Sequence, residues 1–124
     1  REFARALELY EEAGSKKDVA RTANNLGDAW FKAYPEHMEE AESLYLQALE
    51  GYRGLPDERG LGLAYIGLGN VAVSRGEASQ AIAMWTAALE LFNRIGNSEQ
   101  SRQLETALRQ ICTLGRVRGA QRIS

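Results

Sequence analysis

The chain repeats one pattern of apolar and polar positions three times. The copies begin at Phe3, Tyr45 and Trp85, and each follows the order aromatic, x, x, Ala, Leu, Glu, x, aromatic. The aromatic and Ala/Leu positions lie three, four and seven residues apart, which places them on one face of an α-helix. The pattern therefore predicts three amphipathic helices that bury equivalent faces.

A helix-ending signal follows each copy at the same distance. These signals lie in residues 13–15, 55–57 and 95–97, where a Gly or Pro precedes Ser, Asp or Asn. A residue that stops one helix, followed by a side chain that can cap the next, is typical of a tight helix–helix turn. We expect such a turn at all three places.

A second type of helix lies between the repeated ones and contains glycines. Gly27 and Gly69 stand at one shared position of two matching segments. A Gly inside a helix costs about 1 kcal/mol relative to Ala, so the shared glycines indicate close approach of a neighbouring helix. We expect Ala48 and Ala88 to face them. The repeat is 40 residues long, with a two-residue loop insertion in 32–37.

These positions resemble the tetratricopeptide repeat. The resemblance covers nearly the whole chain, and the repeat length is similar to the longer variety of kinesin light chains and bacterial regulators. Ala72 departs from it, because the first complete repeat has an aromatic residue, Trp30, at that position. The matching residues are Leu26, Gly27, Trp30, Ala41, Tyr45 and Ala48, and then Leu68, Gly69, Ala81, Trp85 and Ala88.

The resemblance implies an all-α fold, an α-α superhelix (TPR solenoid) of antiparallel hairpins with about five main helices, in a single domain over residues 1–124. A solenoid needs a polar terminal helix, and we expect Gly115 to end it. The predicted parts are an orphan second helix at 1–13, complete hairpins at 16–53 and 58–94, a capping helix at 98–114 and a frayed basic tail at 115–124. The orphan helix suggests a piece of a longer array.

Composition limits the function classes. The chain has 15 basic and 17 acidic residues mixed along its length, for a net charge of −2, and so gives no broad field for nucleic acid or an anionic membrane. No apolar run approaches the roughly 20 residues that span a bilayer. With one His and one Cys, a metal cluster built from them is excluded. We expect a cytoplasmic protein that is not an enzyme and has no cofactor or metal, with His37 exposed and Cys112 buried.

The first helix of each repeat is expected to line a concave groove that binds a protein or peptide. By the resemblance, Asn25 and Asn70 would hydrogen-bond the backbone of an extended peptide, since an amide both donates and accepts. It is equally open that Asn24 and Asn25 are merely solvated. A carboxylate clamp is disfavoured because Asp28 lies between the two cations of the groove. The expected groove residues are Arg21, Asn24, Asn25, Asp28, Lys32, Leu63, Ile66 and Asn70.

Two functions are therefore predicted. The leading one is a protein–protein interaction scaffold that binds a peptide or helix in the groove, as a regulatory fragment of a larger protein. The alternative is self-association to a homodimer through the exposed helix 1–13.

Overall fold

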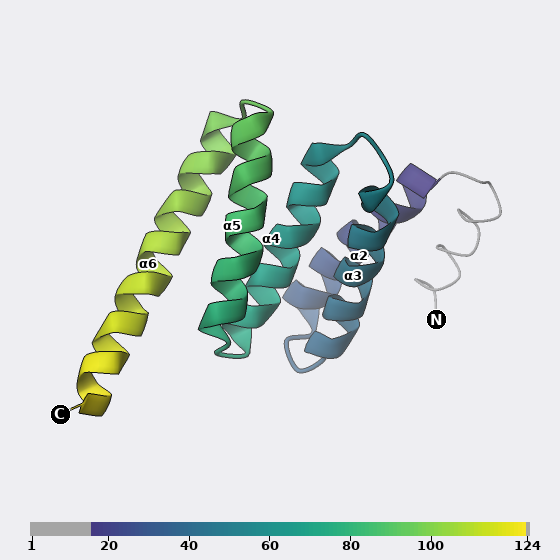
Figure 1. Cartoon of the computed structure of the whole chain (residues 1–124). Helices are drawn as coiled ribbons and strands as arrows, with labels where there is room; N and C mark the ends of the chain where they lie inside the picture. The colour runs from purple at the N-terminus through teal and green to yellow at the C-terminus, as the bar shows by residue number, and fades with distance from the viewer. Residues whose placement is uncertain (1–15, 124) are drawn as a thin grey trace.

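The computed structural model describes the backbone of residues 16–123 and the side chains of residues 16–114. This part of the chain forms α-helices and no strand, which confirms the predicted all-α class for it (Figure 1). The orphan helix predicted for residues 1–13 lies outside the described residues. The helices are α2 (Lys16–Ala33), α3 (Met38–Arg53), α4 (Glu58–Ser74), α5 (Ala78–Arg94) and α6 (Ser98–Ile123).

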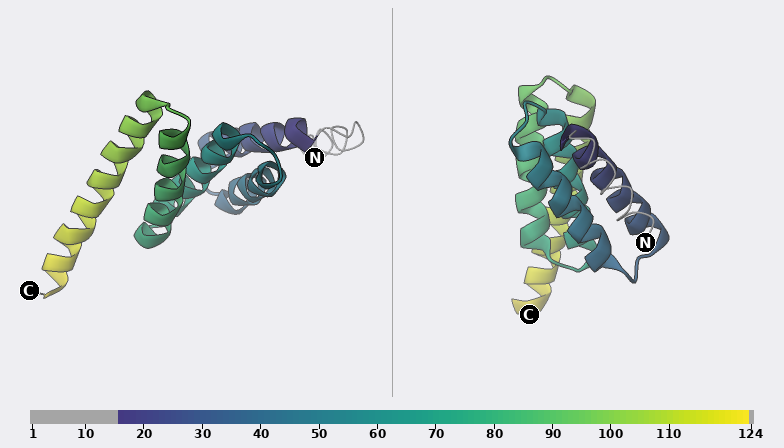
Figure 2. Two further views of the ribbon diagram at one scale, coloured as in Figure 1. Left: turned by 45° about the horizontal axis from the view of Figure 1, so that its top comes forward. Right: turned by 90° about the vertical axis from the view of Figure 1, so that its right-hand side faces the viewer.

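Each helix packs on the next one along the chain. Helices α2 and α3 form one hairpin, and α4 and α5 form a second. The two hairpins meet where α3 packs on α4, and α6 packs on α5. Helix α2 also approaches α4, whereas α6 lies beside α5 alone among the described helices. Figure 2 shows that α6 leans away from the other helices toward its C-terminal end. The helix bounds coincide with the two hairpins expected at 16–53 and 58–94.

An aromatic ring on the second helix of each hairpin packs against a glycine of the first. A Cβ added at Gly27 would lie 2.9 Å from a ring carbon of Tyr45, and one at Gly69 would collide with Trp85. Tyr45 also fills the space beside Gly67 of α4, so its ring lies between the two hairpins. These glycines are therefore needed for close approach.

The atoms nearest to these glycines do not belong to Ala48 and Ala88, which were expected to face them. Both alanines are fully buried, but the nearest side-chain atoms to Gly27 and Gly69 are aromatic ring atoms. The aromatic residue lies three positions before each alanine on the same helix face, and its longer side chain reaches the neighbouring helix first.

The turns at both ends of α5 have the same geometry. Gly76 and Gly96 have φ angles of 74° and 77°, in the left-handed region where Gly avoids a Cβ clash. In each case the following N–H reaches back to a carbonyl five residues earlier, from Glu77 to Ala72 and from Asn97 to Phe92. This is the Schellman ending of a helix.

Side chains of the predicted turn signals then start the next helices. Asp57 Oδ1 accepts from the Gly60 N–H at 2.8 Å, and Asn97 Oδ1 accepts from the Gln100 N–H at 3.2 Å. These bonds confirm the capping expected in 55–57 and 95–97, while residues 13–15 lie outside the described part of the chain. The prediction that His37 is exposed in its loop is also confirmed.

Two expectations for α6 are wrong. The helix does not end at Gly115 but continues to Ile123, so residues 115–123 are not a frayed tail. Gly ends a helix only where the chain turns into the left-handed region, and no Pro follows here to force that turn. Cys112 is exposed rather than buried, and the buried residues of α6 among its described side chains, Ser101 and Leu104, lie in its first half.

Candidate functional site

A pocket of about 440 Å³ opens between the N-terminal parts of α2 and α4. Four of the eight expected groove residues line it, namely Arg21, Asn24, Asn25 and Leu63. The other lining residues are Lys17, Tyr52, Asp57, Arg59 and Gly60. The structure thus gathers half of the predicted groove into one concave site.

Helical spacing brings the α2 side chains of this pocket together. Lys17 and Arg21 are four residues apart, and Asn24 and Asn25 follow at three and four, so all share one face. On the other side, the Tyr52 ring from the end of α3 occupies the space where Gly60 would otherwise carry a Cβ. The glycine therefore lets an aromatic ring form part of the pocket wall at the start of α4.

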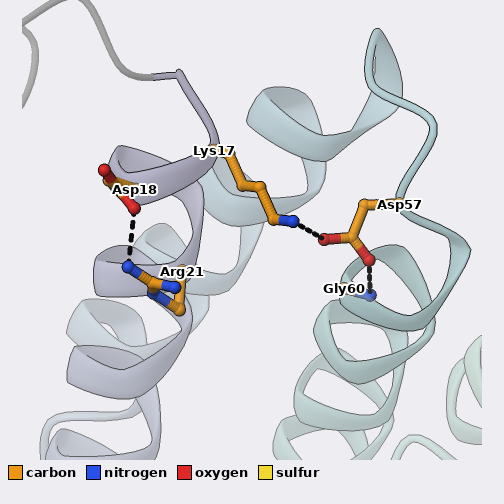
Figure 3. Close-up of polar contacts among 5 residues, drawn as sticks. All are labelled: Lys17, Asp18, Arg21, Asp57 and Gly60. Atoms are coloured by element: carbon orange, nitrogen blue, oxygen red, sulfur yellow. Dashed lines mark hydrogen bonds and ion pairs between the residues drawn. The ribbon is translucent and has the colours of Figure 1, made fainter.

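Figure 3 shows two ion pairs that involve pocket residues, Lys17 with Asp57 and Arg21 with Asp18. Lys17 Nζ lies 3.7 Å from Asp57 Oδ2, and Arg21 Nη2 lies 2.6 Å from Asp18 Oδ1. Asp57 thus serves two groups, because its other oxygen caps α4 through the Gly60 N–H. Both ion pairs are partly exposed, so each contributes at most about 1 kcal/mol to stability.

The Tyr52 phenol is within electrostatic range of three charged groups in this pocket. Burial raises the pKa of Tyr52 above its ordinary value, and the charge of Asp57 raises it further, whereas Arg21 and Arg59 lower it. The phenol is therefore neutral at neutral pH and keeps its O–H as a donor. Arg59 forms no ion pair or hydrogen bond with any residue in the range 16–114.

Asn24 is the most informative residue of the site. It is only 7% exposed, and its Oδ1 is buried without a hydrogen-bond partner among the described residues. Leaving a buried acceptor unpaired costs about 1–3 kcal/mol, and such exceptions are few in folded proteins. The interpretation of Asn24 as merely solvated is therefore wrong, although Asn25 is exposed as that interpretation requires.

The remaining expected groove residues lie outside this pocket. Asp28 is exposed and accepts a hydrogen bond from the Tyr45 hydroxyl, so its carboxylate has a structural role. Lys32 is exposed near the end of α2, and Ile66 and Asn70 are half-buried on α4. Lys32 does not line the pocket that Arg21 lines.

Five of the residues that line the pocket, Gly60 among them, are not among the predicted groove residues. Lys17 could have been found by its spacing of four from Arg21, and Asp57 was assigned only to capping. Tyr52 was assigned to the core, where it is 5% exposed, although it also lines the pocket. Nothing in the sequence marks Arg59, because its place opposite α2 depends on how the two hairpins pack.

The described residues contain neither a metal-binding cluster nor a membrane-spanning helix. Among the described side chains, no group of three or more His, Cys, Asp or Glu residues is placed to hold a metal ion. In the described part of the chain, no helix is both long and apolar enough to cross a bilayer.

No model of a known protein family matches the chain. No curated protein sequence matches it either.

Proposed function

We propose that this chain is a peptide-binding module of a tetratricopeptide-like array. It holds an extended segment of a partner protein in the groove between α2 and α4. The fold supports this proposal through its repetition, since Gly27 with Tyr45 and Gly69 with Trp85 make the same contact in successive hairpins. The approach of α2 to α4 supports it too, because stacked first helices form the groove of such arrays.

The unpaired amide oxygen of Asn24 carries the proposal. An extended peptide presents backbone N–H groups that are free to donate, whatever its side chains are. One such N–H would satisfy Asn24 Oδ1 once the side chain rotates to open this buried oxygen to the pocket, and the exposed Asn25 next to it can both donate and accept. The site thus fits a main-chain ligand better than a reaction centre.

A binding measurement with defined peptides tests this function. The probe is a pool of labelled nonapeptides, random in sequence, with both termini blocked, whose binding is followed by fluorescence anisotropy. We expect Asn24→Ala to weaken binding about tenfold, since one hydrogen bond in a dry site contributes about that factor. Asn93→Ala is the control, because Asn93 is exposed on α5 and does not line the pocket.

Two results would overturn the proposed function. One is that no peptide pool binds the unmodified chain, and the other is that Asn24→Ala binds as well as the control. Self-association through residues 1–13 stays a prediction, because these residues lie outside the described part of the chain. Light scattering on the purified protein tests it, and a monomer would contradict it.

A further inference from the structure

We propose that the pocket between α2 and α4 binds the carboxylate of an Asp or Glu side chain within the bound peptide. This inference rests on the proposed function and specifies which kind of residue enters the pocket. The net charge of the pocket lining differs in sign from that of the whole chain.

The pocket is positive in a protein that is slightly acidic overall. The chain carries a net charge of −2, yet the pocket lining has three cationic side chains, Lys17, Arg21 and Arg59, and one acidic side chain, Asp57. The cations come from two helices, so they surround the opening rather than follow one exposed helix face. Charge complementarity therefore favours an anionic group as the occupant.

The cations have donors available for a ligand. The Lys17 side chain is 63% exposed and lies at 3.7 Å from Asp57, a loose pair that a ligand carboxylate can replace. Asp57 would keep its bond to the Gly60 N–H, so the start of α4 stays capped. Arg21 uses one nitrogen on Asp18, and the other N–H groups of its guanidinium remain.

The charge balance selects a monoanion over a dianion. Among the described residues, three cations face two carboxylates once Asp18, which binds Arg21, is included with Asp57. The excess is one positive charge, which matches an Asp or Glu side chain and falls short of a phosphate monoester. The neutral Tyr52 phenol adds an uncharged donor, and Leu63 offers apolar contact to the methylene groups of the ligand.

Asn24 connects the charged site to the peptide backbone. Asn24 lines the same pocket, and its unpaired oxygen is buried just behind the surface. A rotation of the side chain would present this oxygen to a peptide N–H and so place a neighbouring side chain of the peptide at the cations. Main-chain contact and acid recognition are thus two parts of one site. The two parts are separable by substitution.

The experiment compares matched peptide pools on the purified chain. All pools are labelled, N-acetylated and C-amidated nonapeptides that are random except at the centre, which is Asp or Glu in one pool and Asn or Gln in the other. We expect the acidic pool to bind about tenfold tighter at low salt, as a charge-assisted hydrogen bond contributes at least that factor. The advantage should shrink in high salt.

Substitution of a pocket cation should remove the preference without removing binding. In Arg59→Gln the acidic pool should lose most of its advantage, while the neutral pool binds as before. Arg102→Gln removes an exposed cation from α6, far along the chain from the pocket, and should keep the full advantage. Arg59 is exposed, and circular dichroism of the variant checks that its fold is unchanged.

The outcomes separate the two proposals. Equal binding of both pools, with Asn24→Ala still weakening them, overturns the acid site and leaves the peptide function intact. The absence of binding by either pool overturns both. Tighter binding of a phosphoserine-centred pool, or a requirement for a free C-terminal carboxylate, also overturns the assignment to an internal acidic side chain.

Discussion

Tyr45 in the first hairpin and Trp85 in the second occupy equivalent positions and are 1% and 9% exposed. Both rings press against a glycine of the preceding helix, Gly27 and Gly69 respectively. Their polar atoms differ, because the Tyr45 hydroxyl donates to Asp28, whereas Trp85 Nε1 is buried without a partner among the described residues. The repeat thus preserves the shape of the contact, while hydrogen bonding is specific to each copy.

The position of the polar atom on each ring explains the difference. The Tyr45 hydroxyl is at the far end of its ring. The ring packs against Gly27, and the hydroxyl extends beyond it to donate to Asp28, which lies next to Gly27 on α2. Trp85 Nε1 lies on the side of the indole and faces Gly69 itself. Asn70 stands where Asp28 stands in the first hairpin, but it makes no hydrogen bond with Trp85.

The largest expected effect comes from removing the space that the rings occupy. Gly67→Ala and Gly69→Ala should each lower the free energy of unfolding by about 2–3 kcal/mol, because the added methyl collides with Tyr45 or Trp85. Helix propensity alone would instead raise the free energy of unfolding by about 1 kcal/mol, because Ala favours a helix more than Gly does. Urea denaturation followed by circular dichroism measures the change.

Gly54→Ala is the matched control for these two substitutions. Gly54 has φ −92° at the end of α3, and no atom lies within 4 Å of an added Cβ. Its stability should therefore stay within about 0.5 kcal/mol of the unmodified chain. A stabilising effect of Gly67→Ala would show that the ring does not need the space.

A smaller effect should separate the two aromatic positions by their hydrogen bonds. Asp28→Ala leaves the buried Tyr45 hydroxyl without its acceptor and should cost about 1–2 kcal/mol of unfolding free energy. Asn70→Ala at the equivalent position removes no hydrogen bond to Trp85, so the unfolding free energy should change by less than about 0.5 kcal/mol. Equal losses in the two variants would contradict the difference between the hairpins.

The smallest effect is a loss of stability in alkaline solution. Burial, and then the hydrogen bond and the charge of Asp28, raise the pKa of Tyr45 well above its ordinary value of 10.0. The unfolded chain therefore releases this proton first, so the stabilisation is complete below pH 10 and is lost as the pH rises toward the folded pKa. At pH 10.5 Tyr45 should account for a loss of about 0.8 kcal/mol.

Tyr45→Phe is the control for this pH dependence. The variant has no proton to release at this position, so its unfolding free energy should fall less between pH 9 and pH 10.5 than that of the unmodified chain. Tyr52, whose pKa is also raised, titrates in both proteins and cancels in the comparison. Parallel pH profiles would show that Tyr45 does not titrate differently in the folded state.

Much of the helical layout was predictable, since periodicity and stop signals are local in sequence. The Asp57 and Asn97 caps follow directly from those signals. The partners of the glycines were not predictable in the same way, because spacing alone does not tell whether Ala48 or Tyr45 reaches Gly27 first. The continuation of α6 past Gly115 was missed because a Gly is compatible with both a helix end and a helix interior.

The candidate site was only partly predictable for a similar reason. The side chains on one face of α2, including Arg21 and Asn24, follow from helical spacing. The burial of Asn24 and the position of Arg59 depend on the packing of α4 against α2, which no local pattern specifies. Asp28 is a predicted groove residue, and its hydrogen bond from the core residue Tyr45 could not be predicted from helical spacing.

The glycines of α4 also bear on how the chain folds. This helix has four of them, at 60, 62, 67 and 69, and each faces an aromatic ring from α3 or α5. Together they lower its intrinsic helicity by about 4 kcal/mol relative to alanine. Alone, α4 would not be stable as a helix, so its formation requires both neighbours to be in place. We therefore expect α3, α4 and α5 to fold and unfold as one cooperative unit, in contrast to repeat arrays that open one repeat at a time.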